Sequence, residues 1–347
     1  MQLLKRLSWL TAIVMVLNGL GSQRANAALT YTCDPSVSTV ICTTLQTTIA
    51  SLYNNTFTNI DADDYVTMGS TGLGDNEQYL NFASYTDYLT ALTDAGSSGL
   101  VRTDALASLG VGSSAYALYS GGSVQITAAL ATSLGFTGAT GITSTGASCP
   151  ITAAGCYDDL ITISNTASLY DRVGVQPAGS YDVYSVVEHE TDESLGTSSC
   201  IGTTAGSLVN ECGTNIPSVV DLFRCHGSSH VLLSGATGAY FSYNGCASNG
   251  GDGAVYNTLA NGDDYADFIS SSPCQTTLFI QDGTGCPGYG GGLDITNDGP
   301  GGTDGPEITI LAAEGYNVPE PMSLALMLSG VIGLIGSRRR GRGAMVV

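Results

Sequence analysis

The chain has 347 residues, and its 10 Lys and Arg residues stand against 30 Asp and Glu residues, which gives a formal net charge of −20. A surface this acidic repels the phosphates of nucleic acids, so nucleic-acid binding is excluded as a function. Because 46 residues are Gly and only 12% are charged, we expect short helices and strands joined by many turns.

Residues 1–27 have the pattern of a secretory signal peptide. Lys5 and Arg6 precede an apolar run over 7–20, and Ala-Asn-Ala at 25–27 forms a small-residue cleavage site. The apolar run is too short to favour a membrane anchor. We therefore expect an exported protein that begins, after cleavage, at Ala28.

Residues 28–317 are predicted to form the mature domain. Seven of the 10 basic residues and one of the 30 acidic residues lie outside this segment, so it carries three basic and 29 acidic residues, a net charge of −26. About 290 residues are enough for one large domain or two small ones, and we expect one. Its acidity suits a protein that is soluble outside the cell and can gather cations.

The pattern along this segment predicts an α+β fold with a twisted sheet, a central helix and a loop-rich second half. Helices are expected at 34–54, 85–92, 103–110 and 179–196, strands at 63–74, 159–166 and 239–245, a strand leading into a helix at 123–136, and a helix or strand at 307–317. Ser180 or Asp182 can cap the central helix, and Gly196 can end it.

The central helix carries a pattern of metal-binding residues. His189-Glu190-Thr191-Asp192-Glu193 matches the zinc pattern H-E-x-x-H except that Glu193 replaces the second His. Positions i and i+4 share a helix face, so we predict His189 and Glu193 as metal ligands and the adjacent Glu190 as general base. A carboxylate ligand binds Zn²⁺ and shifts the preference toward Mn²⁺ or Ca²⁺. The alternative is a solvated acidic helix face.

The residues that follow this helix do not match the metzincin pattern. That pattern requires a third His three residues after Gly196, where this chain has Ser199. It also requires a Met downstream, whereas Met68 is the sole Met within 28–317. A strict metzincin is therefore excluded.

A third ligand is expected from the stretch D-L-F-R-C-H-G-S-S-H at 221–230. It offers Asp221, His226 and His230, and the last two are the remaining histidines of the chain. Glu188 and Glu211 are remoter options. The alternatives are that both histidines lie in surface loops and that Asp221 forms an ion pair with Arg224, which is one of three basic residues among 29 acids.

All ten cysteines lie within 28–317 and fall into five close couples: Cys33/Cys42, Cys149/Cys156, Cys200/Cys212, Cys225/Cys246 and Cys274/Cys286. An even number of cysteines in an exported chain predicts disulfide bonds. A thiolate metal site is disfavoured because the chain contains no C-x-x-C.

The Gly-rich stretch 283–305 is predicted to be a long loop. Four acids in or beside it offer oxygen ligands for Ca²⁺: Asp282, Asp294, Asp298 and Asp304. Their spacing does not match the D-x-[DN]-x-[DN]-G pattern. We therefore favour a solvated turn region, and a Ca²⁺-stabilised matrix protein is a third interpretation of the chain.

Residues 318–347 contain V-P-E-P, a short apolar run over 322–336 and an arginine cluster over 338–342. The basic cluster fits the cytoplasmic side of a membrane. The segment closely resembles the PEP-CTERM sorting tail of Gram-negative bacteria, with Pro319, Glu320 and Pro321 as its motif. The resemblance implies an exosortase-type sorting enzyme as partner, membrane contact through the tail alone, and a location in the cell envelope, on the outer surface or in the biofilm matrix.

Taken together, H-E-x-x-E-x-L-G at 189–196 and D-L-F-R at 221–224 resemble a family of secreted zincin-like metallopeptidases with PEP-CTERM tails. The resemblance extends over about 60–317, through T-G-L-G at 71–74. Where the family has a Tyr-Ser turn, this chain has Cys225-His226, which makes Cys225 a candidate for a disulfide. The resemblance implies a zincin-like domain in which a metal, Zn²⁺ or alternatively Mn²⁺ or Ca²⁺, activates water to hydrolyse a peptide or protein. The alternative is an inactive zincin-like structural or adhesive matrix protein.

Overall fold

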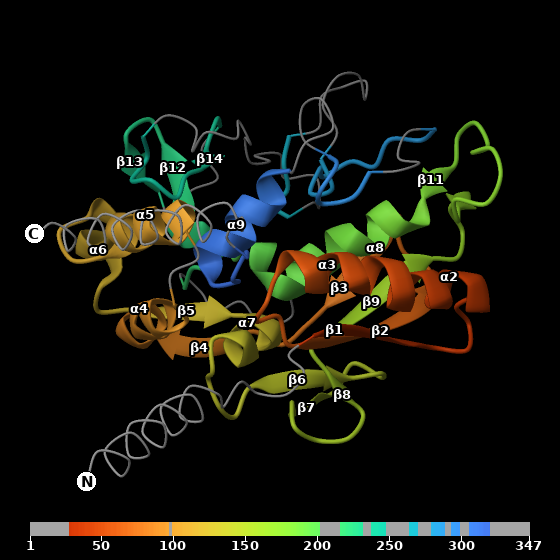
Figure 1. The fold of residues 1–347 in the computed structure, drawn as a ribbon, viewed down its shortest axis with the longest axis horizontal. Coiled ribbons are helices and arrows are strands. Elements are labelled where there is room, and N and C mark those ends of the chain that lie inside the picture. Colours follow the sequence, from red (N-terminus) through yellow and green to blue (C-terminus); the bar gives the residue numbers. More distant parts are fainter. Residues whose placement is uncertain are drawn as a thin grey trace, which may run out of the picture.

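The computed structural model describes residues 28–96, 99–201, 216–231, 237–247, 264–269, 279–288, 293–298 and 305–319. These residues form a mixed α+β structure, which confirms the predicted class (Figure 1). The described part of the chain contains no helix long and apolar enough to cross a membrane. The predicted signal peptide, Glu320, Pro321 and the apolar tail lie outside the described residues.

A four-stranded sheet with the order β1–β2–β9–β3 lies at the centre of the fold. Its strands are β1 (Leu29–Cys33), β2 (Ala62–Gly69), β9 (Asp159–Ser164) and β3 (Gly74–Glu77). The first three are parallel, with Val66 beside Ile161, whereas β3 runs antiparallel to β9. Val66, Ile161 and Ile163 are fully buried, as expected for parallel strands covered on both faces.

Two helical segments lie along the same face of this sheet (Figure 1). Their elements are α2 (Thr39–Thr44), a wider π-helical turn η1 (Leu45–Ile49), α3 (Ala50–Thr56), α8 (Val183–Asp192) and a second π-helical turn η2 (Glu193–Thr197). Leu45, Ile49 and Tyr53 are buried, and the helix expected at 34–54 is present over 39–56. Tyr53 joins the two segments, because its hydroxyl donates to Asp192 Oδ1 at 2.8 Å.

The remaining elements fall into two groups along the chain. Those between β3 and β9 are β4 (Asn81–Ser84), α4 (Tyr85–Asp94), α5 (Gly99–Leu109), α6 (Ser114–Tyr119), β5 (Ser123–Ile126), α7 (Ala128–Ser133), β6 (Thr140–Thr143), β7 (Ser148–Pro150) and β8 (Cys156–Tyr157). Those after β9 are β10 (Leu169–Tyr170), β11 (Tyr181–Asp182), η3 (Val220–Phe223), β12 (Arg224–His226), β13 (Ser229–His230), β14 (Tyr240–Phe241) and α9 (Pro306–Glu314). Strands β6–β8 lie below the sheet in Figure 1, opposite α3 and α8. The predicted strand followed by a helix at 123–136 is confirmed, and 307–317 is a helix.

Disulfide bonds join three of the predicted couples: Cys33–Cys42, Cys149–Cys156 and Cys225–Cys246. Cys200 and Cys286 are also disulfide-bonded, and their predicted partners, Cys212 and Cys274, lie outside the described residues. These bonds are compatible with an exported protein. Each bond that closes such a short loop stabilises the fold by about 2–3 kcal/mol.

Many of the acidic side chains are buried, and Asp158 shows what this does to stability. It is 5% exposed, and its Oδ2 accepts a hydrogen bond from the Asp63 N–H at 2.8 Å. Burial is the main cause that raises the pKa of Asp158 to about 7. The folded protein thus binds this proton more tightly than the unfolded chain does. Ionisation of Asp158 therefore lowers the free energy of unfolding as the pH rises from about 4 to about 7.

The substitution Asp158→Asn is expected to stabilise the protein at a pH of about 8 by roughly 2–4 kcal/mol and to have little effect at a pH of about 4. The amide oxygen can still accept from Asp63, and no charge is buried. Urea unfolding of both proteins at the two pH values measures the difference. An equal change at both pH values would show that packing, and not ionisation, is responsible.

Candidate metal centre

The position of α8, and with it the direction of its metal-binding face, depends on residues of the helix itself. The Asp182 side chain caps the helix by accepting from the Tyr184 N–H at 3.0 Å, and Val183 and Val187 are buried. Gly196 has a φ of 150° in η2, and a Cβ there would lie 2.3 Å from Glu314 Oε2. Glycine is thus required both for the backbone conformation and for space, as the sequence predicted for the end of this helix.

His189 is oriented by the main chain of a distant segment. Its Nδ1 lies 2.9 Å from the carbonyl oxygen of Ile280. Because a carbonyl can only accept, Nδ1 carries the proton and Nε2 is the nitrogen available to a metal. This nitrogen lies 3.6 Å from Glu193 Oε1 and 3.5 Å from Asp267 Oδ1. The structure therefore brings the predicted pair His189 and Glu193 together and adds Asp267 to it.

Asp267 belongs to the short segment 264–269 and is held in place by hydrogen bonds. The Gln281 side-chain amide donates to Asp267 Oδ1 at 3.0 Å, and the Asp264 N–H donates to Oδ2 at 3.1 Å. Asp264 in turn accepts from the Ser199 N–H, just after the helix. One ligand atom each from His189, Glu193 and Asp267 lies within 4.8 Å of the others. Sequence reasoning missed Asp267, because D-D-Y-A-D at 263–267 differs little from the many other acidic stretches of this chain.

The predicted third ligands lie elsewhere, which is a correction to the sequence interpretation. Asp221 is buried and accepts from Ser199 Oγ at 2.6 Å and from the Cys200 N–H at 2.9 Å. It also lies 3.4 Å from Arg224, which confirms the ion pair that was the alternative. His226 is exposed on β12. Glu188 accepts from the Ile295 N–H, and Glu211 lies outside the described residues.

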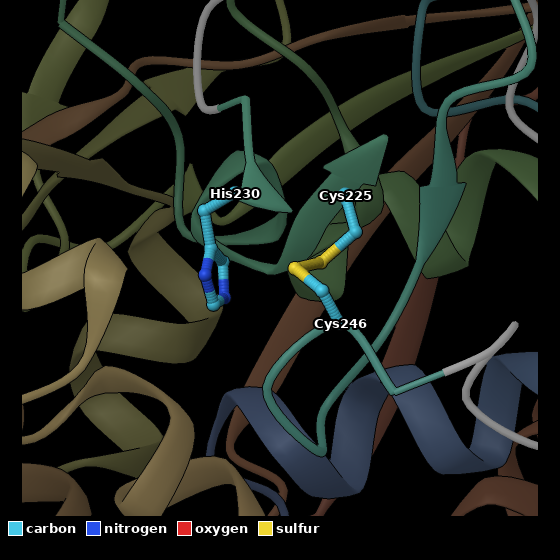
Figure 2. Close-up of side chains that lie close together, drawn as sticks. All are labelled: Cys225, His230 and Cys246. Carbon is cyan, nitrogen blue, oxygen red and sulfur yellow. A yellow bond between two sulfur atoms is a disulfide. The ribbon is translucent and has the colours of Figure 1, made fainter. Parts of the chain in front are cut away.

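His230 also lies outside the candidate metal centre, and both of its ring nitrogens contact serine hydroxyls. Its Nδ1 lies 2.8 Å from Ser114 Oγ, and its Nε2 lies 3.2 Å from Ser108 Oγ. The sulfur atoms of Cys225 and Cys246 are also close to this ring, but Figure 2 shows that they are joined to each other. Disulfide sulfurs are not thiolates and do not bind metals as thiolates do. This cluster is therefore a disulfide beside a hydrogen-bonded histidine, which confirms Cys225 as the disulfide cysteine that the sequence predicted.

Glu190 lies next to the cluster, against the edge strand β3. It is 6% exposed, and a Cβ at Gly74 would lie 2.2 Å from Glu190 Oε1, so glycine makes room for this carboxyl. Burial raises the pKa of Glu190 well above its usual range, Glu193 raises it further, and His189 opposes the shift. Burial also raises the pKa of Asp75 on β3 to about 6, with Glu193 as the second cause. The site thus holds several carboxyls that repel one another.

Comparison with known proteins finds no match. No family model, curated protein or solved structure matches this chain.

The donor set fits a divalent metal ion. An imidazole nitrogen and two carboxylate oxygens are ligands that Zn²⁺ and Mn²⁺ accept, and the carboxylates favour the harder ion of the two. Burial lowers the pKa of His189, but Asp267 and Glu193 outweigh burial and raise it well above the usual range. The same negative charge that attracts a proton to His189 attracts a metal ion in its place.

Proposed function

We propose that the protein is an exported zincin-like metallopeptidase. One observation carries the proposal: His189 Nε2, Glu193 and Asp267 converge at one point, with the buried carboxyl of Glu190 beside them. The central helix and the sheet support the zincin-like assignment, because α8 packs on β9 and on the antiparallel edge strand β3. The H-E-x-x-E-x-L-G stretch at 189–196 supports it further, because it resembles that of secreted zincin-like metallopeptidases.

Each residue has a distinct role in this proposal. His189, Glu193 and Asp267 would hold the metal ion, and the Nδ1–H bond to Ile280 keeps the imidazole oriented. The ion supplies Lewis acidity that polarises the scissile carbonyl and acidifies water. Glu190 accepts a proton from the attacking water and returns it to the leaving amine. The acidity of 28–317 favours neutral or basic peptides as substrates.

Strand β3 is placed to align a substrate. It pairs with β9 on one side, and no other strand of the described residues pairs with it. An extended peptide can add to such an edge through main-chain hydrogen bonds, which would bring its scissile bond to Glu190. The sorting tail with Pro319, Glu320 and Pro321 would deliver this site to the cell envelope, the outer surface or the extracellular matrix with an exosortase-type enzyme as partner.

Elemental analysis of the oxidised mature chain, exported and purified without chelators, tests the metal site. We expect about one equivalent of Zn or Mn, because three protein ligands and one open position are typical of catalytic sites. His189→Ala and Asp267→Asn should each lose the ion, since each removes a ligand. His230→Ala is the matched control and should retain it, because this ring is bound to two serines.

Two results would contradict the proposal. If the chain takes up no transition metal even after reconstitution with Zn²⁺, the helix does not bind metal. The protein is then an inactive structural or adhesive matrix component. If Asp267→Asn retains the metal whereas His230→Ala loses it, the third ligand is the histidine predicted from the sequence.

A further inference from the structure

Two buried carboxyl groups converge at Gly305, away from the candidate metal centre. Asp298 is 2% exposed and Glu307, in the first turn of α9, is fully buried. A Cβ added to Gly305 would lie 1.8 Å from Asp298 Oδ1 and 2.3 Å from Glu307 Oε2. The two oxygens therefore point at the same small volume, which the missing Cβ leaves open.

Each of these carboxyls accepts a main-chain hydrogen bond with one oxygen only. Asp298 Oδ2 accepts from the Ile280 N–H at 3.0 Å, and Glu307 Oε1 accepts from the Gln281 N–H at 2.9 Å. No N–H or O–H donor of the described residues reaches the converging oxygens, Asp298 Oδ1 and Glu307 Oε2, so the hydrogen bond open to them is one in which the two carboxyls share a proton. A buried polar atom without a partner costs free energy and points to an unseen proton, water or ion.

A third buried carboxyl, on α8, adds negative charge to the surroundings of the pair. Asp192 is fully buried, its Oδ1 accepts from Tyr53, and its Oδ2 has no hydrogen-bond partner in the described part of the chain. Burial is the largest cause that raises the pKa of Glu307, and repulsion from Asp298 and Asp192 raises it further. The charge of Asp192 thus makes ionisation of both members of the pair still less favourable.

The arginines of the described residues have partners of their own. Arg102 donates to main-chain carbonyls such as those of Ala312 and Tyr316, Arg172 pairs with Asp182, and Arg224 pairs with Asp221. Two carboxylates this close cannot both stay ionised without a positive group between them. Either the pair shares a proton, or a cation binds it.

We propose that Asp298 and Glu307 bind a Ca²⁺ ion through the two oxygens that converge at Gly305. The donors are oxygens alone, and hard oxygen donors select Ca²⁺ over Zn²⁺. An exported protein meets free Ca²⁺ outside the cell, and the remaining coordination positions can be taken by main-chain oxygens and water. The burial of Asp298 argues against the solvated turn favoured from the sequence and for the alternative, in which Asp298 offers an oxygen ligand to Ca²⁺.

The ion would brace the segment that positions the candidate metal centre. Ile280 donates its N–H to Asp298 and accepts from His189, and Gln281 donates its N–H to Glu307 and its side-chain amide to Asp267. The Ca²⁺ site does not require peptidase activity, since none of its ligands belongs to the other centre.

Thermal unfolding of the oxidised mature chain, with chelator or with CaCl₂, tests the proposal. We expect Ca²⁺ at about 100 times its Kd to raise Tm by about 5–10 °C, with about one equivalent bound by calorimetry. The double variant D298N/E307Q should lose both effects. Gly305→Ala should lose them as well without changing charge, because its Cβ fills the volume between the two oxygens while a φ of −75° suits alanine.

Two variants serve as controls that must keep the Ca²⁺ response. Asp158→Asn removes a buried acid elsewhere, and His189→Ala disables the candidate metal centre. If Ca²⁺ does not raise the Tm of the wild-type chain, the proposal is wrong. Asp298 and Glu307 then share a proton and bind no ion. A rise that persists in both D298N/E307Q and Gly305→Ala places the ion elsewhere and overturns it too. Neither result bears on the transition metal of His189.

Discussion

Glu190→Gln is expected to lower turnover of a cleaved peptide by about 10²–10⁴-fold and to leave the metal content unchanged. The amide keeps the size of the carboxyl that packs against Gly74, but it cannot accept the proton of the attacking water. Initial rates and elemental analysis on the same preparation measure the two quantities. Loss of rate with the ion still bound separates a role in proton transfer from a role in metal binding.

The control for this change is Glu188→Gln, two residues earlier on the same helix. Glu188 accepts from the Ile295 N–H at 3.2 Å and is not among the ligand atoms grouped around His189, so its amide variant should keep its turnover. If Glu190→Gln keeps the wild-type rate, Glu190 is not the general base. The activity would then belong to a different site or a contaminant.

Asp221→Ala is expected to destabilise the protein by about 3–5 kcal/mol without loss of the transition metal. It removes the acceptor for Ser199, Cys200 and Ser218 and leaves Arg224 as a buried charge that has lost its carboxylate. For a chain of this size, Tm should fall by roughly 6–20 °C. Thermal unfolding and metal analysis of the variant give both readouts.

Asp221→Asn and Arg224→Met refine this test. The asparagine keeps one acceptor oxygen and should lose less stability than alanine. The double variant D221A/R224M removes both charges, so it should lose less than the sum of the single changes. A variant at Asp221 that loses the metal but keeps its Tm would restore Asp221 as a ligand and refute its structural role.

The secondary structure around the site could be predicted because it depends on neighbours in sequence. Asp182 caps α8 and Gly196 ends η2, and both positions follow from the local backbone. The helical period alone places His189 and Glu193 on one face. The cysteine couples are also local, since short loops close at low entropic cost.

The burial of the acidic side chains could not be predicted from composition. With 29 acids in 28–317, solvation is the natural expectation for each of them. Asp158, Asp298 and Glu307 are nevertheless buried, because main-chain N–H groups from distant segments bind their oxygens. Such contacts become visible only when the chain is folded.

The sequence by itself determined the helix that carries His189, Glu190 and Glu193, the three local disulfide couples and the strand β9, whereas its parallel pairing with β2 came from the structure. Only the tertiary structure decided that Asp267, and not Asp221, His226 or His230, lies beside His189. The physical reason is that the third ligand arrives by long-range packing of irregular segments. Segment 264–269 is placed by the hydrogen bonds of Asp264 and Gln281, and no period or spacing in the sequence encodes them.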